Sequence, residues 1–210
     1  ILYTSIITLI ITISLFLIYI IVFTSTLTDP ENSSSINYSN KQLDIIPPKK
    51  KIAFVITITK DGHFQDGAAV LAYSIIKSFQ NLSYQYTFVA FVHPTVSIAR
   101  PILSRIGFHV IETPTPVNVS AISGSFLREK INNNGCCGAS ELMKLYAYRL
   151  LQYDRVIHLD ADTIVLKEFS ELIERNYSLI YTTDPNMATH QGEQRMPVQG
   201  GFIILQPSMD

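Results

Sequence analysis

The chain has 210 residues, of which 47% are hydrophobic, and its 16 basic and 17 acidic residues leave a formal net charge of -1 at pH 7. This hydrophobic content is enough for one domain with a substantial core, in addition to an apolar N-terminal stretch. The balanced charge provides no basic surface, which argues against nucleic acid as a partner.

The two cysteines, Cys136 and Cys137, are neighbours in the sequence. Two cysteines exclude a fold held together by a framework of disulfides. Adjacent cysteines rarely bond to each other because the resulting ring is strained. We therefore expect free thiols, or bonds to a partner outside this chain.

The N-terminal residues 1–23 contain no charged side chain and are dominated by Ile and Leu. About 20 apolar residues, at 1.5 Å each, cross the roughly 30 Å hydrocarbon core of a bilayer. The run is longer than the roughly 7 to 15 apolar residues of a cleaved signal peptide. It predicts a transmembrane signal-anchor at residues 1–23.

The next segment, residues 24–51, is rich in Ser, Asn, Thr and Pro and is expected to be a solvated stalk. An anchor, a stalk and a C-terminal domain indicate a single-pass type II membrane protein with a lumenal domain. The Asn-x-Ser acceptor sites for N-glycosylation favour the same orientation. They lie at Asn32, Asn37, Asn81, Asn118 and Asn176.

The remaining residues, 52–210, alternate between strand and helix patterns. Strands are predicted at 52–59, 84–92, 109–113, 155–160, 178–183 and 201–206, and helices at 68–79, 95–106, 138–153 and 168–174. This alternation predicts an α/β domain with a mostly parallel central sheet covered by helices. In the helix at 138–153, the stripe expected to face the core is Leu142, Leu145, Tyr146 and Leu150.

The stretch VIHLDADTIVL, residues 156–166, ends a predicted strand in two carboxylates, Asp160 and Asp162. Ligands of such α/β sheets bind at the carboxyl ends of the strands. In one interpretation the pair holds Mg²⁺ or Mn²⁺, which bridges a nucleotide diphosphate. In the other, DxDxT is the first motif of haloacid-dehalogenase-like phosphatases, with Asp160 as nucleophile and Asp162 as acid and base. The five letters DADTI satisfy both.

The position of the motif separates the two interpretations. In the phosphatase family the motif ends the first strand of the catalytic domain, whereas three predicted strands precede it here. The acidic GDxxxD pattern that follows in the phosphatases has no counterpart downstream. The metal interpretation is therefore favoured.

Residues 53–208 resemble glycosyltransferase family 8, the glycogenin-like retaining transferases with a Rossmann-like GT-A fold. The resemblance covers three segments in the family's order: AFVITITKDGHFQDGAAVLAYSI, ELMKLYAYRLLQYDRVIHLDADTIVLKEFSELI and QGGFIILQPS. It implies transfer of a sugar from a UDP-sugar, with retention and with Mn²⁺ or Mg²⁺, to a glycan, protein or lipid acceptor. Together with the predicted anchor and lumenal domain, this activity leads us to expect a location in the Golgi membrane. A membrane-tethered nucleotide-sugar-binding protein that has lost catalysis is the non-enzymatic alternative.

The resemblance also implies roles for individual residues. Asp160 and Asp162 match the family's metal ligands, with Ala161 between them at the nucleotide. Three residues, Thr59, Asp61 and Phe64, match the family's loop that holds the uridine, in which an aromatic ring lies against the base. Groups that would act on the donor or its sugar are matched by Lys144, Asp184 and Gln199.

Two departures from the family pattern stand out. The family's Asn-Ser-Gly is replaced by Gln199, Gly200 and Gly201, which keeps an amide but removes a hydroxyl. The family's third metal ligand, a histidine in a later motif, has no counterpart, so we expect the domain at 52–210 to be C-terminally incomplete. His158, within the predicted metal strand, is expected to be a packed core residue.

Overall fold

The computed structural model describes residues 49–133, 137–184 and 198–209. The predicted anchor at 1–23 and all but the last three residues of the predicted stalk lie outside this part of the chain. The chain divides into a unit of residues 1–46 and a unit of residues 47–210, and only the second contains described residues. Among the described residues, no helix combines the length and hydrophobicity needed to cross a bilayer.

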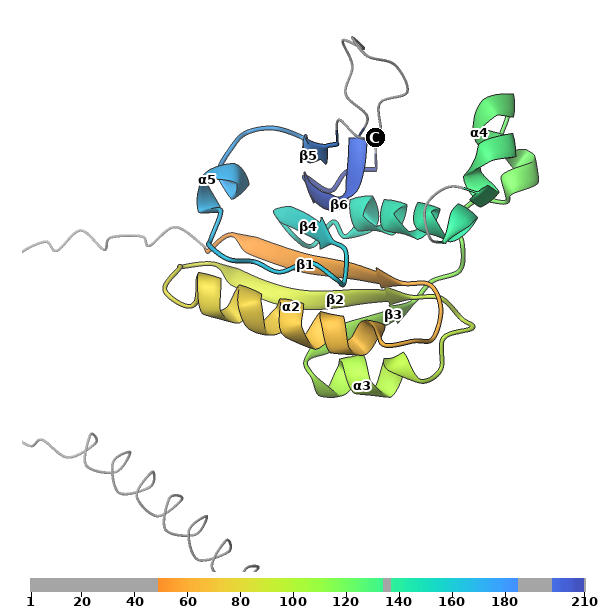
Figure 1. Cartoon of the computed structure of the whole chain (residues 1–210). Helices are drawn as coiled ribbons and strands as arrows, with labels where there is room; N and C mark the ends of the chain where they lie inside the picture. The colour runs from red at the N-terminus through yellow and green to blue at the C-terminus, as the bar shows by residue number, and fades with distance from the viewer. Residues whose placement is uncertain (1–48, 134–136, 185–197, 210) are drawn as a thin grey trace, which may run out of the picture. The chain divides into compact units, whose positions relative to one another are not determined.

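Six strands form one mixed sheet in the order β3-β2-β1-β4-β6-β5 (Figure 1). Strands β3, β2, β1 and β4 are mutually parallel, and β6 runs antiparallel between β4 and β5. The predicted α/β class with a largely parallel sheet is therefore confirmed. The strands are β1 (Lys51–Ile58), β2 (Gln85–Val92), β3 (Phe108–Glu112), β4 (Arg155–Leu159), β5 (Leu179–Thr183) and β6 (Val198–Leu205).

Helices cover both faces of this sheet. Helix α2 (Phe64–Phe79) connects β1 to β2, and α3 (Ala99–Arg105) connects β2 to β3, as expected of parallel crossover units. The long segment between β3 and β4 contains short helical turns. They are η1 (Val119–Ala121), α4 (Ser125–Lys130) and η2 (Ile131–Asn133), and they precede η3 (Gly138–Arg149); α5 (Ser170–Ile173) follows β4.

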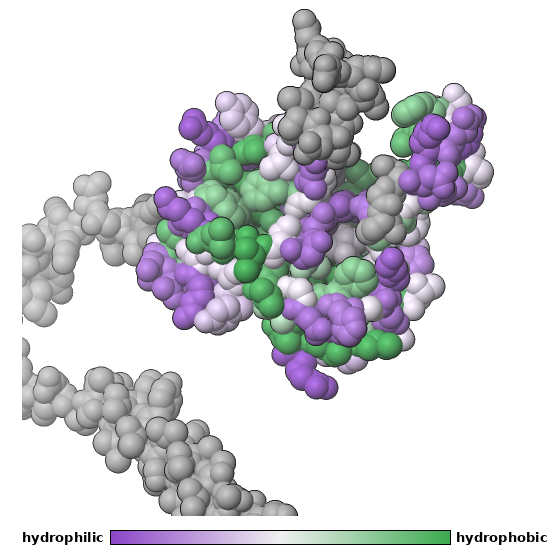
Figure 2. Space-filling model, in the orientation of Figure 1, coloured by the Kyte–Doolittle hydropathy of each residue, from purple (hydrophilic) through white to green (hydrophobic). Residues whose placement is uncertain are grey.

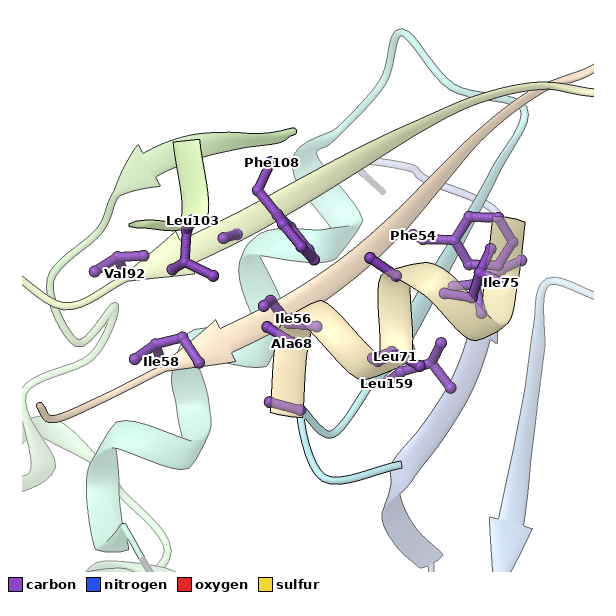
Figure 3. Close-up of a cluster of buried hydrophobic side chains, with 14 of the residues drawn as sticks. Phe54, Ile56, Ile58, Ala68, Leu71, Ile75, Val92, Leu103, Phe108 and Leu159 are labelled. Atoms are coloured by element: carbon purple, nitrogen blue, oxygen red, sulfur yellow. The ribbon is translucent and has the colours of Figure 1, made fainter. Parts of the chain in front are cut away.

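The core consists of two layers of buried side chains, one on each face of the sheet. Alternate residues of β1 point to opposite faces, so Phe54 and Ile56 pack with α2, while Ala53 and Val55 pack with η3. Figure 3 shows the first layer, in which side chains of α2 meet those of the central strands. This arrangement fixes the carboxyl ends of β1 and β4 between α2 on one side and η3 on the other.

Helix η3 occupies the predicted position but differs from the expected amphipathic α-helix. It is a 3₁₀-helix of 12 residues, which is long for this helix type. Its buried residues are Met143 and Ala147, followed by Leu150 at its end, whereas Leu145 is 47% exposed. The predicted stripe is therefore wrong at Leu145, because Met143, Ala147 and Leu150 form the side of the helix that packs against the sheet.

Hydrophobic side chains also reach the surface in the segment between β4 and α5. Ile164 is 56% exposed and Leu166 is 88% exposed, and this segment crosses the face shown in Figure 2. The segment is held against α2, because the Ser74 hydroxyl accepts from the Val165 amide at 3.0 Å and the Ser78 hydroxyl donates to the Val165 carbonyl at 3.2 Å. These contacts fix the chain immediately beyond the aspartate pair.

Arg155 opens β4 with a buried guanidinium, only 5% exposed. Its Nε donates to the carbonyl of Ile173 at 3.2 Å, its Nη1 to that of Tyr177 at 2.6 Å, and its Nη2 to that of Arg175. One side chain thus donates hydrogen bonds to three backbone carbonyls, at the end of α5 and just after it. A lysine could not replace it, because lysine lacks this planar set of donors.

Arg155→Met is expected to lower the free energy of unfolding by about 2 to 4 kcal/mol, because three carbonyl oxygens lose charge-assisted hydrogen bonds. Urea denaturation followed by circular dichroism measures the change. Arg105→Met removes the same group from an exposed position at the end of α3 and should change stability by no more than about 0.5 kcal/mol. Equal losses in the two variants would contradict this role.

Candidate active site

The aspartate pair lies in a turn directly after β4, all five residues of which are buried. The Asp160 amide donates to the Gly201 carbonyl at 3.0 Å, which ties the turn to β6. The amide and hydroxyl of Thr163 donate to the Asp160 carbonyl at 3.1 and 2.7 Å, which closes the turn. Asp160 and Asp162 are therefore presented together at the carboxyl end of the sheet.

Both aspartates line a cleft of about 460 Å³. Its walls come from the end of β1, the start of α2, helix η3, the turn after β4, and β6. Seven of the nine residues that the sequence predicts for the site are among those lining it. The lining residues are Thr57, Thr59, Phe64, Cys137, Glu141, Lys144, Asp160, Ala161, Asp162, Val198, Gln199, Gly200 and Gly201.

Two glycines allow close approach of the backbone to the aspartate turn. A Cβ on Gly67 would lie 2.5 Å from the carbonyl oxygen of Ala161, and one on Gly201 would lie 2.9 Å from Oδ2 of Asp160. Real Cβ atoms do not approach other atoms this closely, so a side chain at position 67 would displace the backbone of the turn, and one at position 201 would displace the side chains of Asp160 and Gln199. The last glycine of the Gln-Gly-Gly segment thus makes room for the first aspartate.

Lys144 reaches the aspartate turn from η3. Its Nζ donates to Oδ1 of Asp160 at 3.0 Å and to the Gly200 carbonyl at 3.3 Å, and it lies 2.9 Å from Oε2 of Glu141. Burial alone would lower the pKa of Lys144, but the hydrogen bond with Glu141 and the charge of Asp160 outweigh it, so the pKa is raised. The side chain is therefore a cation held in the cleft.

Gln199 is held in a folded-back conformation. Its Oε1 accepts from the Gly201 amide at 2.7 Å and from the Thr182 hydroxyl at 3.2 Å. These contacts fix the amide group at the wall of the cleft. Asp184 directly follows β5 and lies two positions after Thr182. It is not among the residues that line the cleft.

His158 is buried within β4 and is 1% exposed, which confirms the expected core position. Its Nε2 is 2.9 Å from the hydroxyl of Thr57, a residue that also lines the cleft. Burial, assisted by the positive charge of Lys144, lowers the pKa of His158 to about 3. The imidazole is thus neutral beneath the site at physiological pH.

Asp61, predicted at the nucleotide loop, has its carboxylate outside the cleft lining. It accepts hydrogen bonds from the amides of Ser97, Ile98 and Ala99 at 2.9 to 3.3 Å, and from the Ser97 hydroxyl at 3.1 Å. These amides belong to the start of α3. The hydrogen bond from the Ser97 amide is the main reason that the pKa of Asp61 is lowered, against an opposing effect of burial. In this structure the carboxylate connects the β1–α2 loop to α3.

Asp61→Asn is expected to lower the melting temperature at pH 7, because an ionised carboxylate is the better acceptor for these amides. The pKa of Asp61 is lowered in the folded protein, so its carboxylate stabilises the folded state fully above pH 3.8, the ordinary pKa of the group. This stabilisation is lost as the pH falls through the lower pKa of the folded protein. Thermal melts between pH 7 and pH 3 should show the variant converging on the wild type. Glu129→Gln, at an exposed position in α4, should not follow this pattern.

Sequence reasoning missed Glu141, which lines the cleft beside Lys144. The two residues are three positions apart in a helix, a spacing at which opposite charges pair. That spacing was the available signal.

The prediction of a free thiol is wrong at Cys137, which is disulfide-bonded, while Cys136 lies outside the described residues.

The aspartate turn suits a hard divalent cation. Carboxylate oxygens are the ligands that Mg²⁺ and Mn²⁺ prefer, and one or two of them together with substrate phosphates make a common site. Within residues 49–133, 137–184 and 198–209, no group of three or more His, Cys, Asp or Glu side chains is placed to hold a metal ion. Two carboxylates such as Asp160 and Asp162 suit a cation site in which substrate phosphates supply further oxygen ligands.

The sequence over residues 55–193 matches Glycosyl transferase family 8, and the chain belongs to this family. No curated protein sequence matches the chain significantly. The chain is similar in structure to the galactosyltransferase LgtC in complex with donor and acceptor sugar analogs, with 15% identity and a TM-score of 0.47. That match covers 74% of this chain and 57% of LgtC.

Two further solved structures are similar to the chain. The WbbM bifunctional glycosyltransferase has 15% identity and a TM-score of 0.46, over 85% of this chain and 34% of WbbM. The glycosyltransferase GlyE of Streptococcus pneumoniae TIGR4 has 13% identity and a TM-score of 0.39, over 76% of this chain and 34% of GlyE. The chain thus spans little more than half the length of LgtC and about a third of the other two.

Proposed function

We propose that this protein is a GT-A glycosyltransferase that moves a sugar from a UDP-sugar to an acceptor, with retention of configuration and with Mn²⁺ or Mg²⁺. The observation that supports this most strongly is the cleft at the carboxyl end of the sheet. There a chain of family 8 brings together two carboxylates, a held lysine and an aromatic ring. The acceptor is a glycan, a protein or a lipid.

In this proposal Asp160 and Asp162 would hold the divalent cation in the cleft. A divalent cation at this position would act as a Lewis acid on the departing diphosphate. Lys144 is a positive charge beside it, fixed before the donor arrives, and such preorganised charge costs little reorganisation during the reaction. Gly201 keeps Oδ2 of Asp160 unobstructed.

The remaining predicted residues bind and orient the donor. Phe64 stacks on the uracil base from the start of α2, with Thr59 beside it at the end of β1. Gln199, fixed by its contacts with Gly201 and Thr182, presents its amide to the sugar. Asp184 is assigned to the sugar by the family resemblance, and Asp61 supports the loop from α3.

The two alternatives make different demands on the site. A phosphatase would need Asp160 as a nucleophile toward a phosphomonoester, whereas family membership favours the transferase. A binding protein without catalysis would keep the cleft and bind UDP-sugar but release no UDP. Turnover therefore distinguishes the transferase from both alternatives.

The direct test incubates the full chain with Mn²⁺, a panel of UDP-sugars and glycan, protein and lipid acceptors for the sugar, and follows the release of UDP. At least one donor should be turned over, and a chelator should abolish the reaction. Binding of UDP-sugars without release of UDP would favour the inactive binding protein. Release of phosphate from a phosphomonoester, with no UDP-sugar used, would favour the phosphatase.

We further propose that residues 1–23 anchor the protein in the Golgi membrane and that the stalk at 24–51 places the catalytic domain at 52–210 in the lumen, in type II orientation. Asn81 and Asn176 support this proposal, because both acceptor sites are exposed.

When the chain is expressed in eukaryotic cells, an N-glycosidase should increase its mobility on a gel. Asn81→Gln and Asn176→Gln should each remove part of that shift. A chain with no shift at any of its five sites would contradict a lumenal domain.

A further inference from the structure

Three groups surround the ammonium of Lys144 at the centre of the cleft. They are the carboxylates of Asp160 and Glu141, at 3.0 and 2.9 Å, and the Gly200 carbonyl, at 3.3 Å. A lysine has three N–H donors, so these three groups use its full donor capacity. The side chains of Lys144, Glu141 and Asp160 are 20%, 26% and 36% exposed, which places the cluster at the cleft wall, partly shielded from water.

The charges of this cluster are unequal. Two carboxylates share one ammonium, so the group carries a net negative charge before any cation or donor binds. If Glu141 were neutral, the ammonium and Asp160 would cancel each other, and the lysine would compete fully with a cation for that carboxylate. Glu141 is therefore placed to determine how much of the charge of Asp160 remains for a metal ion.

We propose that Glu141 is a positioning residue of the donor site, which shares the ammonium of Lys144 with Asp160 and thereby keeps the Asp160 carboxylate available to a divalent cation. The same contact holds the ammonium at the cleft wall, where the donor diphosphate would lie. This inference rests on the proposed function, since it assigns a role within that same site.

The geometry of η3 supports this role. Glu141 and Lys144 are three positions apart, and a 3₁₀-helix places residues at this spacing directly above each other. The helix is held against the sheet by the buried side chain of Met143 and by Ala147. The glutamate and the lysine thus project from one fixed face toward the aspartate turn. Gly200 leaves the space beside the ammonium open, because a Cβ there would lie 3.4 Å from Nζ.

The test measures binding of Mn²⁺ alone by the full-length protein, using the loss of the electron paramagnetic resonance signal of free Mn²⁺. Glu141→Gln should weaken binding about 10-fold or more, the effect typical of losing a group that supports a metal ligand. Lys144→Met should not weaken it, because a competing cation is removed. The double variant Glu141→Gln/Lys144→Met should return toward the wild-type affinity, since its cluster has the wild-type net charge.

Controls separate this effect from misfolding. Glu141→Asp keeps the charge and should bind Mn²⁺ better than Glu141→Gln, while Glu171→Gln removes a carboxylate at an exposed position in α5 and should bind normally. Thermal melts of all variants verify that each is folded. If Glu141→Gln does not fold, the Mn²⁺ affinities of Glu141→Asp and of the double variant, each compared with that of wild type, test the same role of Glu141.

The proposal is overturned if the wild type fails to bind Mn²⁺, if Glu141→Gln binds it as tightly as wild type, or if the double variant stays as weak as the single one. Failure of the proposed function has a different signature, because it is read from UDP release. A wild type that binds Mn²⁺ but turns over no UDP-sugar would contradict the transferase while leaving the role of Glu141 intact.

Discussion

Asp160→Asn is expected to reduce the rate of UDP release by about 100-fold or more, the scale of losing one preorganised electrostatic group in an active site. The substitution removes the charge shared with Lys144 and an oxygen ligand for the cation, while retaining the shape of the side chain. Asp162→Asn should have an effect in the same direction, because Asp162 lines the same cleft two residues further on. Both rates are measured as initial velocities at saturating Mn²⁺ and donor.

Glu171→Gln provides the matched control, since it removes one negative charge at an exposed position that does not line the cleft. It should leave the rate of UDP release unchanged. Thermal melts show whether the aspartate variants remain folded at the assay temperature. Full activity of a folded Asp160→Asn protein would contradict the assignment of this residue to the metal and the donor.

Gly67→Ala is expected to lower both stability and activity. In an unobstructed helix, a change from Gly to Ala stabilises by up to about 1 kcal/mol. Here the new Cβ would lie 2.5 Å from the backbone oxygen of Ala161, so α2 and the aspartate turn must move apart. Overpacking of this kind costs about 1 to 3 kcal/mol. Denaturant unfolding should therefore show a net loss, and Mn²⁺ binding should weaken because the turn that carries both aspartates is displaced.

Gly124→Ala is the corresponding control, because no atom lies within 4 Å of its Cβ position. Gly124 precedes α4, where Ala is a poorer capping residue than Gly, so a loss of up to about 1 kcal/mol is expected there. The two variants differ in Mn²⁺ binding, which Gly124→Ala should leave unchanged. A stabilised Gly67→Ala protein with normal Mn²⁺ binding would show that α2 does not constrain the aspartate turn.

The central part of the fold could be predicted from the sequence because its hydrophobic patterns are strong. The β-branched run that forms β1 and the run that ends at Leu159 are both buried strands of the sheet. A short run such as β5 was also found, although four of its five residues are exposed. The antiparallel direction of β6 could not be found, because strand patterns contain no information on direction.

The aspartate pair, Lys144 and Phe64 were predicted from motif and resemblance, and the structure brings them to one cleft. Their assembly follows from topology, because the carboxyl ends of adjacent parallel strands meet at one edge of the sheet. The roles of these residues remain predictions until ligands are bound. The cation that suits the turn is likewise inferred from the chemistry of its carboxylates.

Contacts that depend on tertiary approach could not be predicted. The carboxylate of Asp61 binds amides 36 to 38 residues further along the chain. The need for glycine at position 67 arises only where α2 meets the aspartate turn. The side of η3 that packs against the sheet contains Met143 and Ala147 in place of Leu145, which the apolar pattern did not indicate.

The most direct test of the central claim, that the cleft beside Asp160 and Asp162 is a metal-dependent site for a nucleotide diphosphate, is calorimetric titration of UDP into the full-length protein. With Mn²⁺ present, the wild type should bind one UDP per chain, and binding should be lost with a chelator or in Asp160→Asn. Equal binding of UDP with and without the metal, or by the wild type and Asp160→Asn, would contradict it.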